Sequence, residues 1–170
     1  MARLSPAAIR KRARRVRCLF LDVDGVLTDG KLYLGPDGEE LKTNFVRDGY
    51  GIKRLLANGV EVAVISGRPS DAMRKRLEFL GVKHVVLDNE DKLPAYEQIR
   101  DRLGLADTDC AVMGDDAPDL PLMARVGLAL AVADAHASAL KSAHWISRHP
   151  GGQGAVRDAA DMILAAQGRD

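Results

Sequence analysis

Five aspartates occupy two short segments of the chain, and their spacing could support phosphoryl chemistry. Asp22 and Asp24 lie in Asp-Val-Asp-Gly after one apolar run, and Asp115, Asp116 and Asp119 lie in Gly-Asp-Asp-Ala-Pro-Asp after another. Carboxylates that share a small volume repel one another unless a cation or a proton is present. Hard oxygen ligands favour Mg²⁺, which one or two carboxylates hold together with phosphate and water. The two segments therefore predict a magnesium site.

A hydroxyl and a cation complete this set. Ser66 follows a third apolar run in Ser-Gly-Arg, and Lys92 opens a helical segment. Phosphoryl transfer needs positioning and charge neutralisation, which these side chains supply. One Asp can act as nucleophile through an aspartyl-phosphate, and an acid two residues further on can protonate the leaving oxygen and then activate water. Each motif alone is compatible with an ordinary turn, but together they indicate a catalytic site.

Alternating strands and helices must position these residues. Continuous apolar runs predict buried strands over 18–23, 60–65, 84–87, 110–113, 127–132 and 145–147. Helical patterns lie between and after them, over 49–58, 70–80, 92–103, 117–125, 134–141 and 154–167. This alternation indicates an α/β fold, a Rossmann-like three-layer parallel sheet with helices on both faces. Ligands of such sheets bind beyond the carboxyl ends of the strands, where the polar motifs lie.

Two segments depart from the alternation. Residues 31–45 surround a Pro-Asp-Gly turn and predict a β-hairpin inserted after the first strand. Residues 1–16 are rich in arginine, and Ser5-Pro6 predicts a short basic helix over 6–15. We therefore expect a basic N-terminal arm over 1–16 and a single domain over 17–170, with its C-terminal tail over 148–170. The arm either attracts an anionic partner or is a solvated helix that packs Ile9 and Ala13.

Composition narrows the class of protein. The chain has 170 residues, 46% hydrophobic and 29% charged, as in one soluble globular domain. A net charge of +1 and 4% aromatic residues argue against a nucleic-acid partner. Two cysteines fit a reducing cytoplasm better than a disulfide framework. Since no apolar run approaches the ~20 residues of a membrane span, we expect no membrane partner.

The motifs carry a resemblance to a known superfamily. Asp-Val-Asp-Gly-Val-Leu-Thr, Ser-Gly-Arg, Lys92 and Gly-Asp-Asp-Ala-Pro-Asp resemble, in order, the four motifs of the haloacid dehalogenase-like phosphatases. The resemblance implies the fold of that superfamily, a nucleophile at Asp22 and a general acid/base at Asp24. It further implies Mg²⁺ binding by the Asp22 side chain, the Asp24 carbonyl and Asp115, phosphoryl binding by Ser66 and Lys92, and supporting acids at Asp116 and Asp119.

The chain has no room for the cap domain that covers the site in most members of this superfamily. The hairpin, two helices and two strands already fill the intervals between Thr28 and Ser66 and between Arg68 and Lys92. A capless site is open, so it takes a large substrate or borrows cover from a neighbouring subunit. The hairpin is the candidate for assembly, because its free edges would otherwise invite aggregation.

Three further stretches narrow the resemblance. Residues 44–53, 114–123 and 151–157 resemble the phosphatases of 3-deoxy-D-manno-octulosonate 8-phosphate (Kdo 8-phosphate). This implies a capless homotetramer of lipopolysaccharide biosynthesis, whose glycine-rich C-terminal tail can reach a neighbour's site. The implied contacts with a phosphorylated sugar acid are Asp24, Phe45, Val46, Arg47, Asp48, Gly49, Lys53, Ser66, Gly67, Arg68, Arg76 and Lys92. Cations suit a substrate that carries both phosphate and carboxylate. Gln153 stands where that family more often has arginine, which removes a charge from the tail.

Three alternatives stay open at this point. A sialic-acid-type enzyme of the same capless class would act on the 9-phosphate of a nonulosonate by the same chemistry. A phosphoryl-accepting signalling domain also gathers acids, a hydroxyl and a lysine at strand ends, but the order Asp-Val-Asp-Gly-Val-Leu-Thr argues against it. An idle scaffold is disfavoured by the presence of Asp24 and Lys92.

Overall fold

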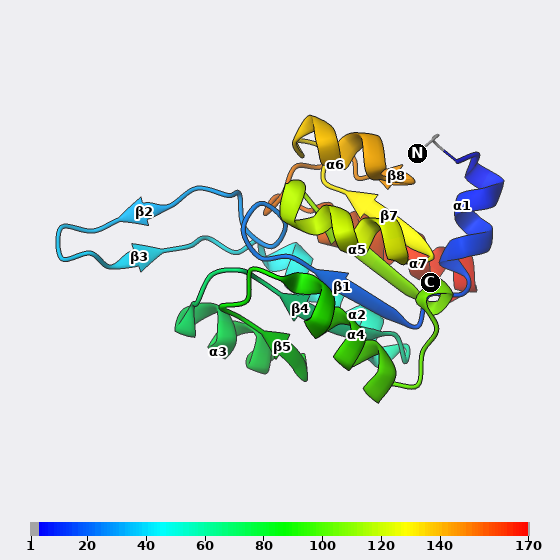
Figure 1. Ribbon diagram of the computed structural model, residues 1–170, viewed down its shortest axis with the longest axis horizontal. Coiled ribbons are helices and arrows are strands. Elements are labelled where there is room, and N and C mark those ends of the chain that lie inside the picture. The colour runs from blue at the N-terminus through cyan, green and yellow to red at the C-terminus, as the bar shows by residue number, and fades with distance from the viewer. Residues whose placement is uncertain (1–3, 170) are drawn as a thin grey trace.

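A six-stranded sheet forms the centre of the chain in the computed structural model, which describes residues 4–169 (Figure 1). Its strands are β1 (Cys18–Leu21), β4 (Glu61–Ile65), β5 (His84–Val86), β6 (Cys110–Gly114), β7 (Leu128–Ala131) and β8 (Trp145–Ile146). They run in the order β5-β4-β1-β6-β7-β8, and every neighbouring pair is parallel. All the strands predicted from the apolar runs are confirmed, with ends that move by one or two residues.

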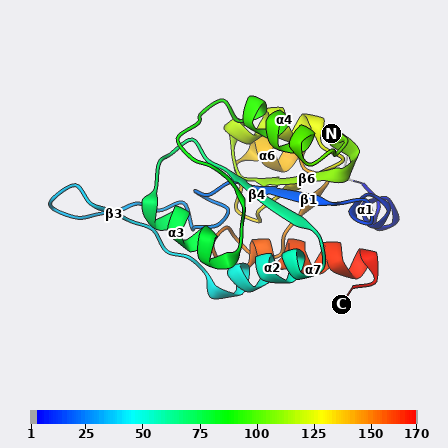
Figure 2. The same cartoon turned by 90° about the horizontal axis from the view of Figure 1, so that it is seen from below.

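Helices cover both faces of this sheet, as predicted (Figure 2). One face carries α2 (Val46–Ala57), α3 (Asp71–Leu80) and α7 (Ala155–Gln167), and the other carries α4 (Lys92–Arg102), α5 (Leu120–Arg125) and α6 (Ala137–Ser142). Short 3-10 turns, η1 (Asp107–Asp109) and η2 (Ala117–Asp119), precede β6 and α5. The predicted helix over 117–125 begins with η2 because Pro118 and Pro121 have no amide hydrogen to donate.

The core explains why the central strands read as unbroken apolar runs. All four residues of β1 are buried, because helices lie above and below it. Phe20 points its ring at Tyr96 of α4 in an edge-on contact, with ring centroids 4.8 Å apart. Each such buried side chain stabilises the fold by ~1.5–3 kcal/mol. The sheet is thus a rigid platform for the residues that follow its strands.

The predicted hairpin is confirmed and projects from the body of the molecule (Figure 1). It consists of β2 (Tyr33–Leu34) and β3 (Glu40–Leu41), paired antiparallel. Gly38 in its turn has a φ of 81°, a value that favours glycine. Leu34 is 71% exposed and Leu41 is 62% exposed, so the hairpin presents apolar side chains to solvent.

The basic N-terminal segment forms α1 (Pro6–Ala13), capped by the Ser5 hydroxyl as predicted. This helix packs on the domain at the opposite end from the hairpin (Figure 1). Ala13 is fully buried, and Arg12 donates to the carbonyl of Gly127 at 2.7 Å. The first three residues of the predicted arm, and residue 170 of the predicted tail, lie outside the described residues. Between residues 4 and 169, no helix has the length and apolar character needed to cross a membrane.

Candidate active site

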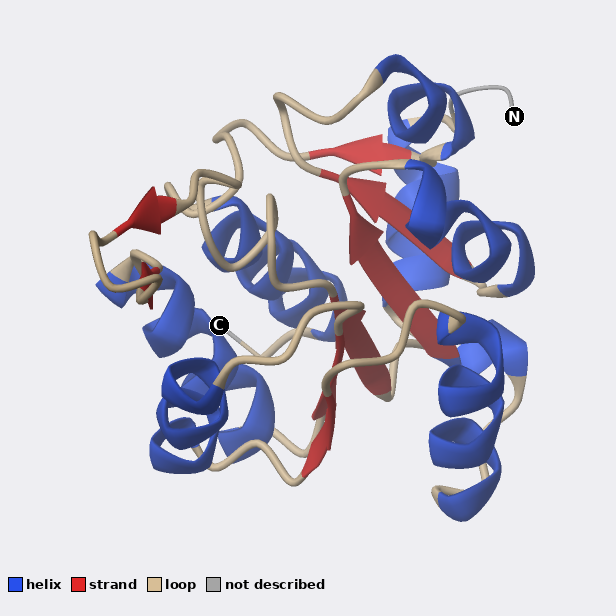
Figure 3. Cartoon of the chain, turned by 60° about the vertical axis from the view of Figure 1, so that its left-hand side comes forward, coloured by secondary structure: helices blue, strands red, loops and turns tan. Residues whose placement is uncertain are grey.

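The residues predicted to do the phosphoryl chemistry lie at the carboxyl edge of the sheet, around the ends of β1 and β6. From β1 the chain continues to β4 on one side, and from β6 it continues to β7 on the other. Such a switch in direction leaves a crevice beyond the strand ends in open α/β sheets. Asp22 directly follows β1 and Asp115 directly follows β6, and their strands pair in register at Leu21 and Met113. Loops gather beyond these strand ends in Figure 3.

A buried lysine bridges two of the acids. The Nζ of Lys92 lies 2.8 Å from Asp22 Oδ1 and 2.7 Å from Asp119 Oδ1, and the lysine side chain is 4% exposed. Asp91 caps the start of α4 and so fixes the backbone of Lys92. Burial acts to lower the pKa of Lys92, but the two aspartates outweigh it and the net pKa is raised. Lys92 therefore stays charged and can bind a phosphoryl oxygen.

Three carboxylates form a candidate metal centre. Oxygens of Asp22, Asp115 and Asp119 lie within 4.8 Å of one another. Burial and the neighbouring acids raise the pKa of Asp22 to about 6 and that of Asp115 to about 7. Because the ionised carboxylates repel one another, a bound cation would stabilise their charged forms. The residues therefore fit Mg²⁺, which Asp22 and Asp115 would hold and which would neutralise charge on a phosphoryl group.

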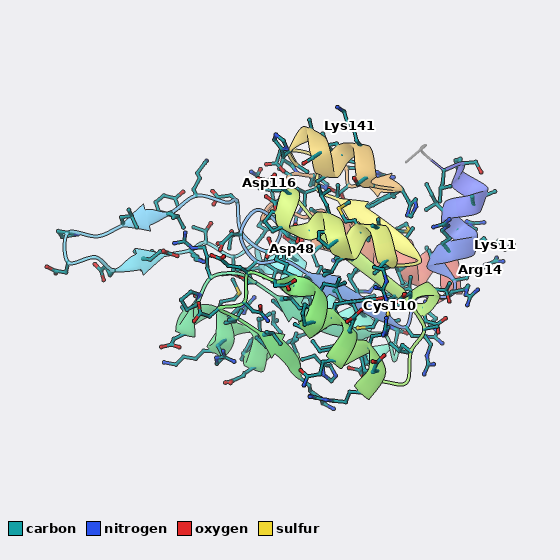
Figure 4. The ribbon with its side chains drawn as sticks, viewed as in Figure 1. Lys11, Arg14, Asp48, Cys110, Asp116 and Lys141 are labelled. Atoms are coloured by element: carbon teal, nitrogen blue, oxygen red, sulfur yellow. The ribbon has the colours of Figure 1, made fainter. Side chains whose placement is uncertain are left out.

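Asp119 and Asp116 take different positions. Asp119 belongs to the oxygen cluster, but its Oδ1 accepts from Lys92 and its Oδ2 accepts from the Asp115 backbone N–H at 2.9 Å. Asp119 thus fixes both the Lys92 ammonium and the backbone of Asp115. Asp116 is 55% exposed and caps η2 through the backbone N–H of Ala117. Figure 4 labels Asp116 close to the start of α5.

Close backbone approach explains two glycines of the motifs. Gly25 has a φ of 89°, and a Cβ there would overlap the Asp115 carboxylate. A Cβ on Gly114 would likewise overlap the side chain of Asp119. The Thr28 hydroxyl, which is fully buried, accepts from the N–H groups of Gly25 and Gly30 and so holds the loop that carries Asp24.

Asp24 has a partner that sequence reasoning did not identify. The Nζ of Lys42 lies 2.8 Å from Asp24 Oδ1 and 2.9 Å from Asp24 Oδ2, and the Lys42 side chain is 5% exposed. Arg68, predicted to bind substrate, lies 3.9 Å from Asp24 and donates to Glu40 at 2.6 Å. Glu40 also pairs with Lys42 at 3.2 Å. Lys42 matches none of the motifs, so only its place just after β3 could have indicated it.

Ser66 is held in place by two strands. Its side chain is nearly buried, and its backbone N–H donates to the Val86 carbonyl at the end of β5. Its hydroxyl oxygen accepts from the Arg68 backbone N–H at 3.2 Å. A Cβ on Gly67 would make only ordinary van der Waals contacts with Glu90 and Asn89. The hydroxyl therefore sits at the same sheet edge as Asp22, as the sequence predicted.

The remaining predicted substrate residues lie on α2 and α3. Asp48 is buried, and its two oxygens accept from the backbone N–H groups of Gly154 and Arg157 at 3.1 and 2.8 Å. Its carboxylate therefore joins α2 to the start of α7, and Figure 4 labels it. Lys53 and Arg76 both lie over the ring of Phe79, at 4.5 and 5.6 Å from its centroid.

These α2 and α3 residues stand apart from the acid cluster. Within residues 4–169, no hydrogen bond or ion pair joins Lys53 or Arg76 to the clustered acids. Val46 is 75% exposed and Arg47 lies over the ring of Phe45, while Gly49 leaves space for the Arg76 guanidinium. Their substrate roles stay predictions.

The glycine-rich segment before α7 packs against its own chain. Gly152 donates to the Val26 carbonyl at 2.9 Å, and Gly151 donates to Asp134 at 2.9 Å. A Cβ on Gly151 would overlap the carbonyl oxygen of Gly25. This segment therefore braces the loop that follows Asp22 and Asp24. That the C-terminal tail also reaches a neighbour's site stays a prediction.

The described residues place Asp22, Asp24, Ser66, Lys92 and Asp115 at the carboxyl edge of a parallel sheet. This is the arrangement expected of the haloacid dehalogenase-like hydrolases. The model of that family, described as haloacid dehalogenase-like hydrolase, matches residues 85–157. The chain is 44% identical over 163 residues to a 3-deoxy-D-manno-octulosonate 8-phosphate phosphatase from Escherichia coli, covering 96% of this chain and 87% of the relative. It therefore belongs to the family of these phosphatases.

Solved structures of this family superpose closely on the chain. The phosphatase from Yersinia pestis is 45% identical, with a TM-score of 0.94 over 95% of this chain and 88% of that one. The phosphatase from Moraxella catarrhalis is 33% identical, with a TM-score of 0.94 over 96% of this chain and 94% of that one. Its structure was solved in complex with magnesium, phosphate and Kdo.

Proposed function

We propose that this chain is a Mg²⁺-dependent phosphatase that hydrolyses Kdo 8-phosphate to Kdo and inorganic phosphate, a reaction of lipopolysaccharide biosynthesis. The observation that carries the proposal is the buried Lys92 between Asp22 and Asp119, beside Asp115. The relatives and the Moraxella complex supply the substrate and the metal. The same site without the family relationship would indicate only phosphoryl transfer.

The residues divide the reaction into two steps. In the first, a carboxylate oxygen of Asp22 attacks phosphorus while the sugar oxygen leaves with a proton from Asp24. In the second, Asp24 takes a proton from water as that water attacks phosphorus and frees Asp22. Lys92 and Ser66 hold the phosphoryl oxygens through both steps. Mg²⁺, when bound by Asp22, the Asp24 carbonyl and Asp115, supplies further neutralisation of the phosphoryl charge.

We further propose that the sugar acid contacts residues 45–49, Lys53, Gly67, Arg68 and Arg76. Lys53 and Arg76 supply positive charge near each other, because both lie over Phe79. Such cations suit the carboxylate of the substrate. Asp48 contributes through the backbone of α2, since its own oxygens are bonded to α7.

The hairpin supports a proposal of assembly as a cytoplasmic homotetramer. Tyr33, Leu34 and Leu41 expose large apolar surfaces on a two-stranded sheet with free edges. Such surfaces are typical of protein interfaces. Because residues 4–169 form no cap domain, a neighbouring subunit is the available cover for the open site.

A direct substrate comparison tests the proposed function. kcat/KM is measured with Mg²⁺ for Kdo 8-phosphate and for the 9-phosphate of a nonulosonate. We expect a clear preference for the 8-phosphate, and a preference for the 9-phosphate would assign the chain to the sialic-acid-type alternative. Stable phosphorylation of the protein without release of phosphate would instead support a signalling domain.

A further inference from the structure

Lys42 lies at the base of the hairpin and contacts the acid that is proposed to move protons. It follows β3 directly, in the segment that returns from the hairpin to α2. Its side chain is 5% exposed, although the two residues beside it in the chain are exposed. A lysine buried to this extent needs compensating negative charge. Asp24 and Glu40 supply it, at 2.8 and 3.2 Å.

The Asp24 carboxylate depends on this lysine for its orientation. Lys42 is within 3 Å of both carboxylate oxygens, whereas Arg68 reaches only one of them, at 3.9 Å. The Asp24 Oδ1 is buried and makes no hydrogen bond with proper geometry, so only the nearby ammonium charge compensates it. Without Lys42, the carboxylate would keep a single distant cation. A catalytic group held so loosely departs from the geometry that proton transfer requires.

We propose that Lys42 is a positioning residue for Asp24. The Lys42 ammonium holds the Asp24 carboxylate at the leaving oxygen and balances the negative charge that appears on Asp24 when its proton leaves. This inference rests on the proposed function. As the bond from phosphorus to the sugar oxygen breaks and the bond to Asp22 forms, the proton moves from the Asp24 carboxyl to the sugar oxygen. Asp24 is then a carboxylate, the state that the Lys42 ammonium stabilises. The hairpin is thereby tied directly to the catalytic acid.

Leaving groups separate this role from the alternatives. An aryl phosphate such as p-nitrophenyl phosphate expels a stable phenolate that needs no proton, whereas an alkyl phosphate such as hexose 6-phosphate expels a poor leaving group that does. Proton donation contributes ~10²–10⁴-fold to such reactions, and a misplaced group loses a large part of it. We expect Lys42→Met to lower kcat/KM for hexose 6-phosphate and for Kdo 8-phosphate by about 10–100-fold. The value for the aryl phosphate should change less than about 2-fold, since its leaving group does not use Asp24.

The ratio of the alkyl to the aryl value is the decisive quantity. A fault in folding or assembly lowers the activity toward both substrates equally and leaves the ratio unchanged. An unchanged ratio in Lys42→Met would therefore overturn the proposal. A loss confined to Kdo 8-phosphate would also overturn it, because Lys42 would then bind the sugar carboxylate. The failure of wild-type protein to prefer Kdo 8-phosphate would count against the proposed function but would leave this ratio measurable.

Two matched variants complete the experiment. Lys42→Arg keeps a cation at this position, and we expect it to recover part of the alkyl-to-aryl ratio. Lys31→Met makes the same substitution elsewhere in the hairpin, on a side chain that is 72% exposed and forms its ion pair with Asp29. It should leave the ratio at the wild-type value. An equal fall of the ratio in Lys31→Met would show that the hairpin, and not Lys42, carries the effect.

Discussion

The metal-free protein should lose stability as the pH rises from about 4 to 7, because its acid cluster then ionises without a bound metal ion. The pKa of Asp22 is about 6 in the fold, against 3.8 for the unperturbed group. The folded state therefore binds this proton more tightly than the unfolded state. Linkage makes the contribution fully present at low pH and progressively lost as the pH rises through 6. Asp115, with a pKa of about 7, acts in the same direction over a slightly higher range.

The size of the effect follows from the same values. The difference between about 6 and 3.8 for Asp22, which is 12% exposed, corresponds to ~3 kcal/mol of unfolding free energy. Asp115 acts in the same direction, but part of its shift comes from repulsion by Asp22, so the two contributions do not add in full. Mg²⁺ at about 100 times its dissociation constant adds ~2.7 kcal/mol by mass action. Magnesium should therefore restore most of the stability that the ionised acids remove.

Urea unfolding at one fixed protein concentration measures this directly, in EDTA and in Mg²⁺. We expect the unfolding free energy in EDTA to fall by ~3 kcal/mol between about pH 4 and pH 7, and to fall much less in Mg²⁺. Asp22→Asn lacks the titrating carboxyl, so the difference between the wild-type and variant curves isolates Asp22. Other titrating groups, such as His144, whose pKa is lowered by burial and Arg12, contribute to both curves and cancel. A wild-type curve in EDTA with no fall, or with the same fall in Mg²⁺, would refute the reasoning.

Three further predictions concern other parts of the structure. Lys92→Met leaves its two aspartate partners buried without a cation, so the unfolding free energy in urea should fall by ~3–5 kcal/mol; a change below ~1 kcal/mol would contradict the bridging role. Gly151→Ala places a methyl group against the Gly25 carbonyl oxygen and should lower phosphatase turnover about 100-fold. Gly59→Ala places its methyl group in open space, so its only expected effect is a loss of ~1–2 kcal/mol of stability from backbone strain. Leu34→Asp should reduce the mass measured by light scattering, and an intact tetramer would rule out this part of the hairpin as the interface.

The fold and the centre of the site were predictable because local sequence patterns determine them. β1 and β6 are buried on both faces, so they appear as unbroken apolar runs with an acid immediately after each. Parallel pairing then brings Asp22 and Asp115 together without further information. Ser66 and Lys92 follow by the same rule, since one follows a strand and the other starts a helix at that edge.

The contacts that local patterns do not encode were missed. Lys42 reaches Asp24 only because the hairpin returns along the edge of the site, a tertiary arrangement with no periodic signal. Asp48 was predicted to contact the substrate, yet its carboxylate accepts hydrogen bonds from backbone N–H groups more than a hundred residues away in the sequence. The sequence did not indicate where the basic helix α1 docks. Its Arg12 donates to the Gly127 carbonyl and its C-cap Arg14 donates to the Ala166 carbonyl, and no local pattern encodes such backbone partners.

The covalent intermediate on Asp22 is the most direct test of the account. Wild-type protein with Mg²⁺ and Kdo 8-phosphate is quenched in acid during the first turnover, digested and analysed by mass spectrometry. We expect a phosphoryl group on the peptide that contains Asp22, which disappears together with phosphate release in Asp22→Asn. Undiminished phosphate release by Asp22→Asn, or a phosphoryl group on any other residue, would contradict the central claim.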